Sequence, residues 1–131
     1  KPLTMFGDDS VRAAKSMHSV YNIDEDLVED WYKKLHSLFG EASGRNTGWA
    51  EYDKLVNEAT KIGIDESELR DKLNSDSFDD RIESDQAEGR QVGLRGTPYF
   101  MLYNQNERGV YDTISGAQRY NLFKSKIDDK I

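Results

Sequence analysis

The sequence contains no cysteine, which excludes a disulfide, a thiolate metal site and a thiol nucleophile within the chain. It also lacks any apolar run near the roughly 20 residues that a membrane-spanning helix needs, so no membrane segment is expected. Positive charge is in short supply: lysine and arginine total 18 against 25 acidic residues, and the net charge is −7. Because binding to a phosphate backbone depends on clustered positive side chains, nucleic acid is not an expected partner.

Aromatic residues are well represented, with seven tyrosines, five phenylalanines and two tryptophans among 131 residues. Such side chains bury enough apolar surface to offset the entropy lost on ordering a chain. The length is that of one ordinary domain. These features predict a folded, water-soluble chain.

Apolar residues at helical spacing predict five successive helices, over residues 11–21, 27–39, 49–62, 69–73 and 78–91. The second pattern is the strongest. Thr47 is the expected N-cap of the third helix, and either Asp76 or Ser77 that of the fifth. Gly63 is expected to end the third helix, and the run Asp65–Glu68 to open the fourth. A short apolar run, Leu3–Phe6, predicts an edge strand before the first helix.

The pattern changes after residue 92. Tyr99–Tyr103 is apolar at every position, which predicts a strand covered on both faces. After a polar turn, Asn104–Gly109, the alternating run Val110–Ile114 predicts an antiparallel partner strand. Ser115 is expected to cap a last helix whose inward residues would be Ala117, Tyr120, Phe123 and Ile127.

The segment 93–102, GLRGTPYFML, resembles the loop and strand that close the DsbA-like branch of the thioredoxin superfamily. That branch carries a Gly-x-x-Gly-x-Pro turn before a hairpin, and Gly93, Gly96 and Pro98 match it. The run 115–118, SGAQ, resembles the Gly-Ala-Gln that announces the family's final helix. The pattern Phe6-x-x-Asp9-Ser10-x-x-Ala13-Ala14 is similar to the family's passage into its inserted helical domain.

The resemblance implies an α/β, thioredoxin-like fold of the DsbA type with an inserted all-helical domain. Residues 1–8 would form an edge strand and a turn, residues 9–92 the helical insertion, and residues 93–131 the C-terminal thioredoxin-like part. The family's first strand and Cys-x-x-Cys helix, whose N-terminus lowers the pKa of a thiol, have no counterpart here. We expect the sequence to be a fragment, with a cysteine-free relative as the alternative.

The absent strand would be central, between Leu3–Phe6 and Tyr99–Tyr103. Open strand edges recruit other strands. We therefore expect direct pairing of Leu3–Phe6, a strand from residues upstream of Lys1, or a strand-exchanged or edge-paired dimer.

The resemblance also identifies a substrate-binding site at Gly96, Thr97 and Pro98. In the family the proline is cis, and the residue before it offers its backbone to an extended polypeptide substrate by strand addition. It implies no cofactor, and no residue of this chain is expected to be catalytic.

Other chemistry-bearing residues have simpler interpretations. His18 and His36 lack metal-ligand spacing and are interpreted as surface or boundary residues. The acidic clusters Asp24–Asp26, Asp76–Asp80 and Asp128–Asp129 do not fit a calcium loop, and helix starts account for most of them. We expect no metal site.

Three functions remain open. The first is part of a DsbA-like thiol:disulfide oxidoreductase acting on protein disulfides, for which this chain supplies the cis-proline loop and a helical lid. The second is a cysteine-free peptide-binding module. The third is a relative of kappa-type glutathione transferases and isomerases, which ranks last because the aromatic-Gly-x-Asp-Arg turn of that family is absent. The resemblance implies a periplasmic or other extracytoplasmic location, where disulfides persist.

Overall fold

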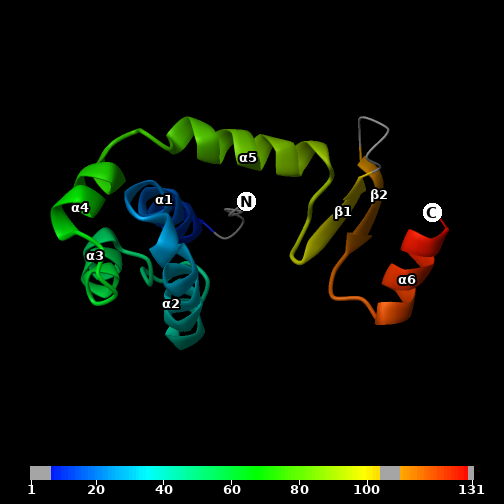
Figure 1. The fold of residues 1–131 in the computed structure, drawn as a ribbon, viewed down its shortest axis with the longest axis horizontal. Helices are drawn as coiled ribbons and strands as arrows, with labels where there is room; N and C mark the ends of the chain where they lie inside the picture. Colours follow the sequence, from blue (N-terminus) through cyan, green and yellow to red (C-terminus); the bar gives the residue numbers. More distant parts are fainter. Residues whose placement is uncertain (1–6, 104–109, 130–131) are drawn as a thin grey trace. The chain divides into compact units, whose positions relative to one another are not determined.

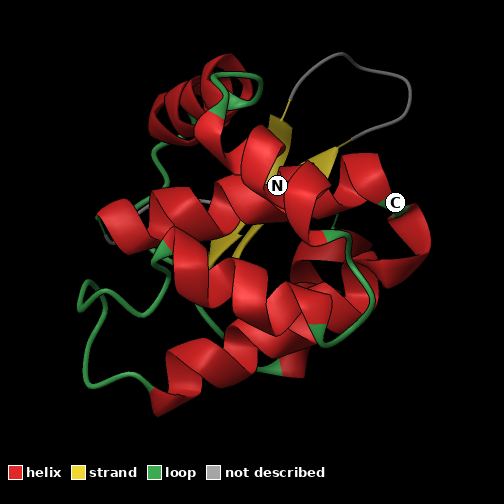
Figure 2. Cartoon of the chain, turned by 90° about the vertical axis from the view of Figure 1, so that its left-hand side faces the viewer, coloured by secondary structure: helices red, strands yellow, loops and turns green. Residues whose placement is uncertain are grey.

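A computed structural model describes residues 7–103 and 110–129. The chain divides into two units, Lys1–Glu88 and Gly89–Ile131 (Figure 1). Helix is the dominant secondary structure along the described residues (Figure 2). No helix in these ranges is long and apolar enough to cross a membrane. The predicted strand Leu3–Phe6 and the predicted turn Asn104–Gly109 lie outside the described residues.

The first unit is helical in all of its described regular structure. Its elements are α1 (Asp8–Ile23), the 3₁₀-helix η1 (Glu25–Leu27), α2 (Val28–Glu41), α3 (Tyr52–Thr60), α4 (Glu66–Asn74) and α5 (Asp79–Gln91). Helix α1 packs against α2, α3 and α4, and α5 continues past the boundary between the units. All five predicted helices are therefore present.

A single apolar cluster holds the first unit together. Trp31, Leu55 and Leu69 are fully buried within it, one from each of α2, α3 and α4. The indole N–H of Trp31 donates to the Ser16 hydroxyl of α1 at 3.1 Å, so the largest side chain of the core also has its polar atom satisfied. The amphipathic stripes that predict these helices account for this cluster.

A buried carboxylate joins the start of α1 to the loop that precedes α3. Asp9 is fully buried, and its two oxygens accept the backbone N–H groups of Gly48, Trp49 and Ala50 at 2.8, 3.2 and 3.2 Å. Arg12 also donates to Asp9 at 2.9 Å. Burial raises the pKa of Asp9, but these hydrogen bonds outweigh it and hold the pKa below its ordinary value.

These contacts explain where α3 begins. The prediction that Thr47 caps this helix is wrong: the N-cap is Glu51, and the Thr47 hydroxyl donates to the Gly44 carbonyl. Since the N–H groups of residues 48–50 are bound by Asp9, they are held outside the helix. By contrast, the prediction that Asp65–Glu68 opens a helix is confirmed: Asp65 is the N-cap of α4 and accepts the Glu68 N–H at 2.8 Å.

The second unit contains a hairpin and a helix. Strands β1 (Tyr99–Tyr103) and β2 (Val110–Ser115) pair antiparallel, and α6 spans Tyr120–Asp128. The rings of Phe100 and Phe123 meet edge to face with centroids 4.9 Å apart, which joins β1 to α6. Ile114 is buried in the same unit. The predicted hairpin followed by a helix is confirmed.

Three details of the second unit differ from the sequence predictions. Ser115 ends β2 instead of capping α6, whose N-cap is Arg119. Tyr120 and Ile127 of α6 are 76% and 41% exposed and Ala117 is exposed, so only Phe123 of the predicted inward residues is partly covered. Strand β1 is not covered on both faces by the described residues, because Phe100 and Tyr103 are exposed.

Candidate functional site

The Gly96–Pro98 loop follows a well-formed helix end. The Gly93 N–H donates to the Arg90 carbonyl at 3.1 Å and the Leu94 N–H to the Gly89 carbonyl at 2.9 Å, the two bonds of a Schellman motif. Gly93 has φ of 73°, a left-handed conformation that glycine adopts without a Cβ penalty. The motif turns the chain out of α5 and into the loop.

The loop is held by hydrogen bonds on both sides of the predicted site. The Tyr99 hydroxyl donates to the Val92 carbonyl at 2.9 Å, and the Gly116 N–H donates to the Pro98 carbonyl at 2.8 Å. The Thr97–Pro98 peptide bond is cis, the isomer that the resemblance implies. Gly96 is half-buried, whereas Thr97 and Pro98 are exposed. Thr97 is therefore exposed to solvent in a loop whose flanking residues are held by hydrogen bonds.

The backbone of Thr97 has no hydrogen bond to any part of residues 7–103 or 110–129. Strand β1, which follows, also has backbone groups without hydrogen bonds along one of its edges within the described residues. In the antiparallel register Tyr99 lies opposite Ser115, and Met101 lies opposite Thr113. The Gly116 N–H donates to the Pro98 carbonyl, so Pro98 and Gly116 are a hydrogen-bonded pair. Because such pairs alternate along antiparallel strands, the pairs of Tyr99 and of Met101 have no mutual hydrogen bonds. The backbone groups of Tyr99 and Met101 therefore point away from β2.

Strand β1 has β2 as its one neighbour within the described residues. Thr97, Tyr99 and Met101 consequently form a continuous row of backbone donors and acceptors, which we call the open edge. An extended polypeptide can pair with such an edge through its main chain. Sequence reasoning identified Thr97 as a binding residue and expected an open edge along Tyr99–Tyr103. It did not assign Tyr99 and Met101 to the substrate site, although the period-2 geometry of a strand starting at Tyr99 is a signal for them.

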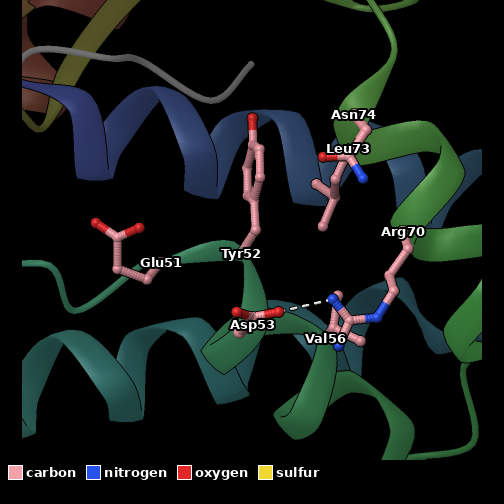
Figure 3. Close-up of a pocket in the computed structure, with 7 residues that line it drawn as sticks. All are labelled: Glu51, Tyr52, Asp53, Val56, Arg70, Leu73 and Asn74. Carbon is pink, nitrogen blue, oxygen red and sulfur yellow. Dashed lines mark hydrogen bonds and ion pairs between the residues drawn. The ribbon is translucent and has the colours of Figure 1, made fainter.

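A separate hollow of about 300 Å³ lies in the first unit (Figure 3). Its lining residues are Glu51, Tyr52, Asp53, Val56, Arg70, Leu73 and Asn74. Arg70, its cationic side chain, donates to Asp53 at 2.7 Å (Figure 3). It also donates to Glu66 at 3.0 Å. Because that cation is already paired twice, the hollow offers no uncompensated charge to a ligand, and it contains none of the predicted site residues.

The two histidines lie apart from the open edge in the sequence and belong to the first unit. His36 is exposed, and the centroid of its ring lies 4.4 Å from that of Tyr32. His18 is half-buried and stacks on Phe78, with the ring centroids 5.7 Å apart. The surface or boundary interpretation is confirmed. Burial lowers the pKa of His18; Asp85 opposes this shift and Arg81 adds to it.

The acidic clusters mainly mark helix starts. Asp24 caps η1 by accepting the Asp26 N–H at 3.0 Å, and Asp79 and Asp80 occupy the first turn of α5. Asp128 instead ends α6 and pairs with Lys124. Within the part of the chain that the structure describes, no group of three His, Asp or Glu residues is placed to hold a metal ion.

Comparison with known families gives one match. Residues 2–128 match the family model described as a DSBA-like thioredoxin domain. No curated protein and no solved structure matches the chain significantly. The mostly helical fold with a small sheet is compatible with a helix-rich thioredoxin-like fold.

Proposed function

Because this chain belongs to the DSBA-like thioredoxin domain family, we propose that it is the polypeptide-binding part of a thiol:disulfide oxidoreductase that acts on protein disulfides. In this proposal the Gly96–Pro98 loop binds an extended segment of the substrate through the backbone of Thr97. Within the described residues, Tyr99 and Met101 extend this row of free backbone groups in the present chain, where the strand that precedes the family's Cys-x-x-Cys helix is absent. The helices of the first unit supply the lid of the substrate site. The thiols come from a Cys-x-x-Cys segment that is not part of this sequence.

The observation that carries the proposal is the exposed Thr97 backbone in line with Tyr99 and Met101. All three residues lack backbone hydrogen bonds on the side away from β2 within the described ranges. Strand addition gives affinity through main-chain hydrogen bonds, which suits an enzyme that must accept many sequences around a disulfide. Anchoring of Pro98 by Gly116 and of Tyr99 by Val92 reduces the ordering cost on binding.

A cysteine-free peptide-binding module is the second candidate, and the absence of any cysteine favours it. Both candidates use the backbone of Thr97, but only the second leaves Tyr99 and Met101 free, because the strand before the Cys-x-x-Cys helix would pair with them in the first. The candidates also differ in whether a thiol pair ever reaches a bound disulfide, so a polypeptide carrying this chain together with a Cys-x-x-Cys segment would have exchange activity only under the first.

Peptide binding to the purified chain tests what the two candidates share. An extended nine-residue peptide pairs through the N–H groups of every second residue, so N-methylation of one alternating set should abolish binding while the other set is tolerated. Amide chemical shifts should change at Thr97, Tyr99 and Met101. Equal effects of the two methylated sets, or shift changes elsewhere only, would rule out strand addition at this edge.

A second copy of the chain is a competing occupant of the same edge, and we propose edge-paired dimers when no peptide is present. Sedimentation over a range of protein concentrations should show dimerisation that added peptide reverses. A monomer at all concentrations, with the edge open to solvent, would contradict this dimer.

A further inference from the structure

Charge is divided unequally between the two units. The second unit, Gly89–Ile131, has seven lysines and arginines against four aspartates and glutamates, whereas the first unit has 11 against 21. A protein with a net charge of −7 therefore carries its loop and open edge on a unit of net positive charge.

Some of this positive charge is not neutralised. Lys124 pairs with Asp128, and Lys126 contacts Asp112 at 2.7 Å. Arg90, Arg95 and Arg119 are exposed, and none of them forms an ion pair with a carboxylate of residues 7–103 or 110–129. Exposed arginines without a carboxylate partner among the described residues are candidates for binding an external anion.

Two of these arginines flank the candidate site. Tyr99 and Ser115 face each other at one end of the hairpin. Arg95 lies four residues before Tyr99 and Arg119 four residues after Ser115, so the chain carries both within a few residues of the hairpin end that holds Thr97. The first turn of α6, which follows Arg119, contains no acidic residue that would cancel this charge.

We infer that the polypeptide bound at the open edge is acidic, with carboxylate side chains close to the residue that pairs with Thr97. This inference rests on the function proposed above. A guanidinium donates two parallel hydrogen bonds to a carboxylate, a geometry that an amide cannot reproduce with equal strength. At physiological ionic strength charges are screened over about 8 Å, so the charges next to the peptide on the same unit act on it most strongly.

The experiment compares two nine-residue peptides on the full chain at 20 and 300 mM salt. One contains aspartate and glutamate near its centre, and the other replaces each with asparagine or glutamine. The acidic peptide should bind about tenfold more tightly at 20 mM salt, the combined effect of two partly exposed ion pairs, and the advantage should shrink at 300 mM. Arg95→Gln and Arg119→Gln should each reduce it about threefold and leave the amide peptide unaffected.

Lys124→Gln is the matched control, because it removes one positive charge from the same unit at a residue already paired with Asp128. It should leave the preference unchanged. Equal binding of both peptides, or a preference that survives the double variant of Arg95 and Arg119, would overturn the inference while leaving the proposed function intact. Failure of both peptides to shift the amides of Thr97, Tyr99 and Met101 would overturn both.

Discussion

The Oδ2 atom of Asp9 accepts the backbone N–H of Gly48 at 2.8 Å, across 39 residues of sequence. The same carboxylate takes two further backbone N–H groups, from Trp49 and Ala50, and a bond from Arg12. Arg12 in turn donates to the Ala50 carbonyl at 3.1 Å. One buried side chain thus determines the path of the chain between α2 and α3.

Asp9→Asn should destabilise the first unit by about 2 kcal/mol, because an amide nitrogen replaces one acceptor oxygen and faces donors. Denaturant unfolding followed by tryptophan fluorescence measures this unit directly, since Trp31 and Trp49 both belong to it. Asp8→Asn is the matched control: Asp8 is the exposed neighbour in the same helical turn and should change the free energy of unfolding by less than 0.5 kcal/mol or so. Equal effects would show that the Asp9 network contributes little.

Acid should remove the stabilisation that comes from the Asp9 carboxylate. Its pKa in the fold is below the ordinary 3.8, so its contribution is complete above about that pH and is lost as the pH falls through the lower value in the fold. The free energy of unfolding should therefore fall more between pH 5 and pH 3 in the wild type than in Asp9→Asn. Parallel curves would mean that other carboxyl groups cause all of the acid sensitivity.

His18 should make the first unit less stable in mild acid. Burial lowers its pKa from the ordinary 6.5, so the fold favours the neutral ring. Stability from this residue is complete above pH 6.5 and is lost as the pH falls from there through its lower pKa in the fold. His18→Gln should reduce the difference in unfolding free energy between pH 7.5 and pH 5.5, whereas His36→Gln, on the exposed surface of α2, should preserve it.

Ser16 and Trp31 should show energetic coupling. Both are fully buried, and Ser16→Ala leaves the indole N–H without its acceptor, a loss of about 1–3 kcal/mol. Adding Trp31→Phe removes the orphaned donor, so the double variant should be more stable than the sum of single effects by about 1 kcal/mol. Ser37→Ala, at an exposed serine of α2, serves as the control. Strict additivity would contradict the role of this hydrogen bond.

The chain by itself should have no dithiol activity. Its only sulfur atoms are those of methionine, and a thioether does not exchange with a disulfide. Insulin reduction and peptide oxidation should both stay at the rate of the blank, with an active oxidoreductase as the positive control. A rate clearly above the blank would mean that the chemistry does not depend on thiols of this chain.

Features set by neighbouring residues could be predicted from the sequence. The start of α4 within Asp65–Glu68 and the bounds of Tyr99–Tyr103 depend on side chains within a few positions, and both predictions agree with the structure. Thr47 failed as a cap because Asp9, 38 residues earlier, binds the adjacent backbone N–H groups. Such long-range competition leaves no local signal.

In the candidate site, too, features set by neighbouring residues could be predicted from the sequence, and features set by distant contacts could not. The turn residues Gly93 and Pro98 are apparent in the sequence, and the structure shows the helix end and the cis bond there. Which residues of β1 have unpaired backbone groups depends on the register with β2, and periodicity alone does not determine that register. That Arg95 pairs with no carboxylate of residues 7–103 or 110–129 likewise depends on where those carboxylates lie in space.

The structure at the start of α1 restricts position 7 to glycine. A Cβ at this position would lie 2.8 Å from Cγ of Asn46, and the glycine has φ of 87°. Asn46 itself accepts the Asp9 N–H at 3.0 Å, so its side chain does for α1 what a local cap does for other helices. A side chain at position 7 would be strained by this φ whatever residue stands at position 46, so glycine should be retained there as the family diverges. A change of Asn46 would cost α1 the acceptor of its Asp9 N–H.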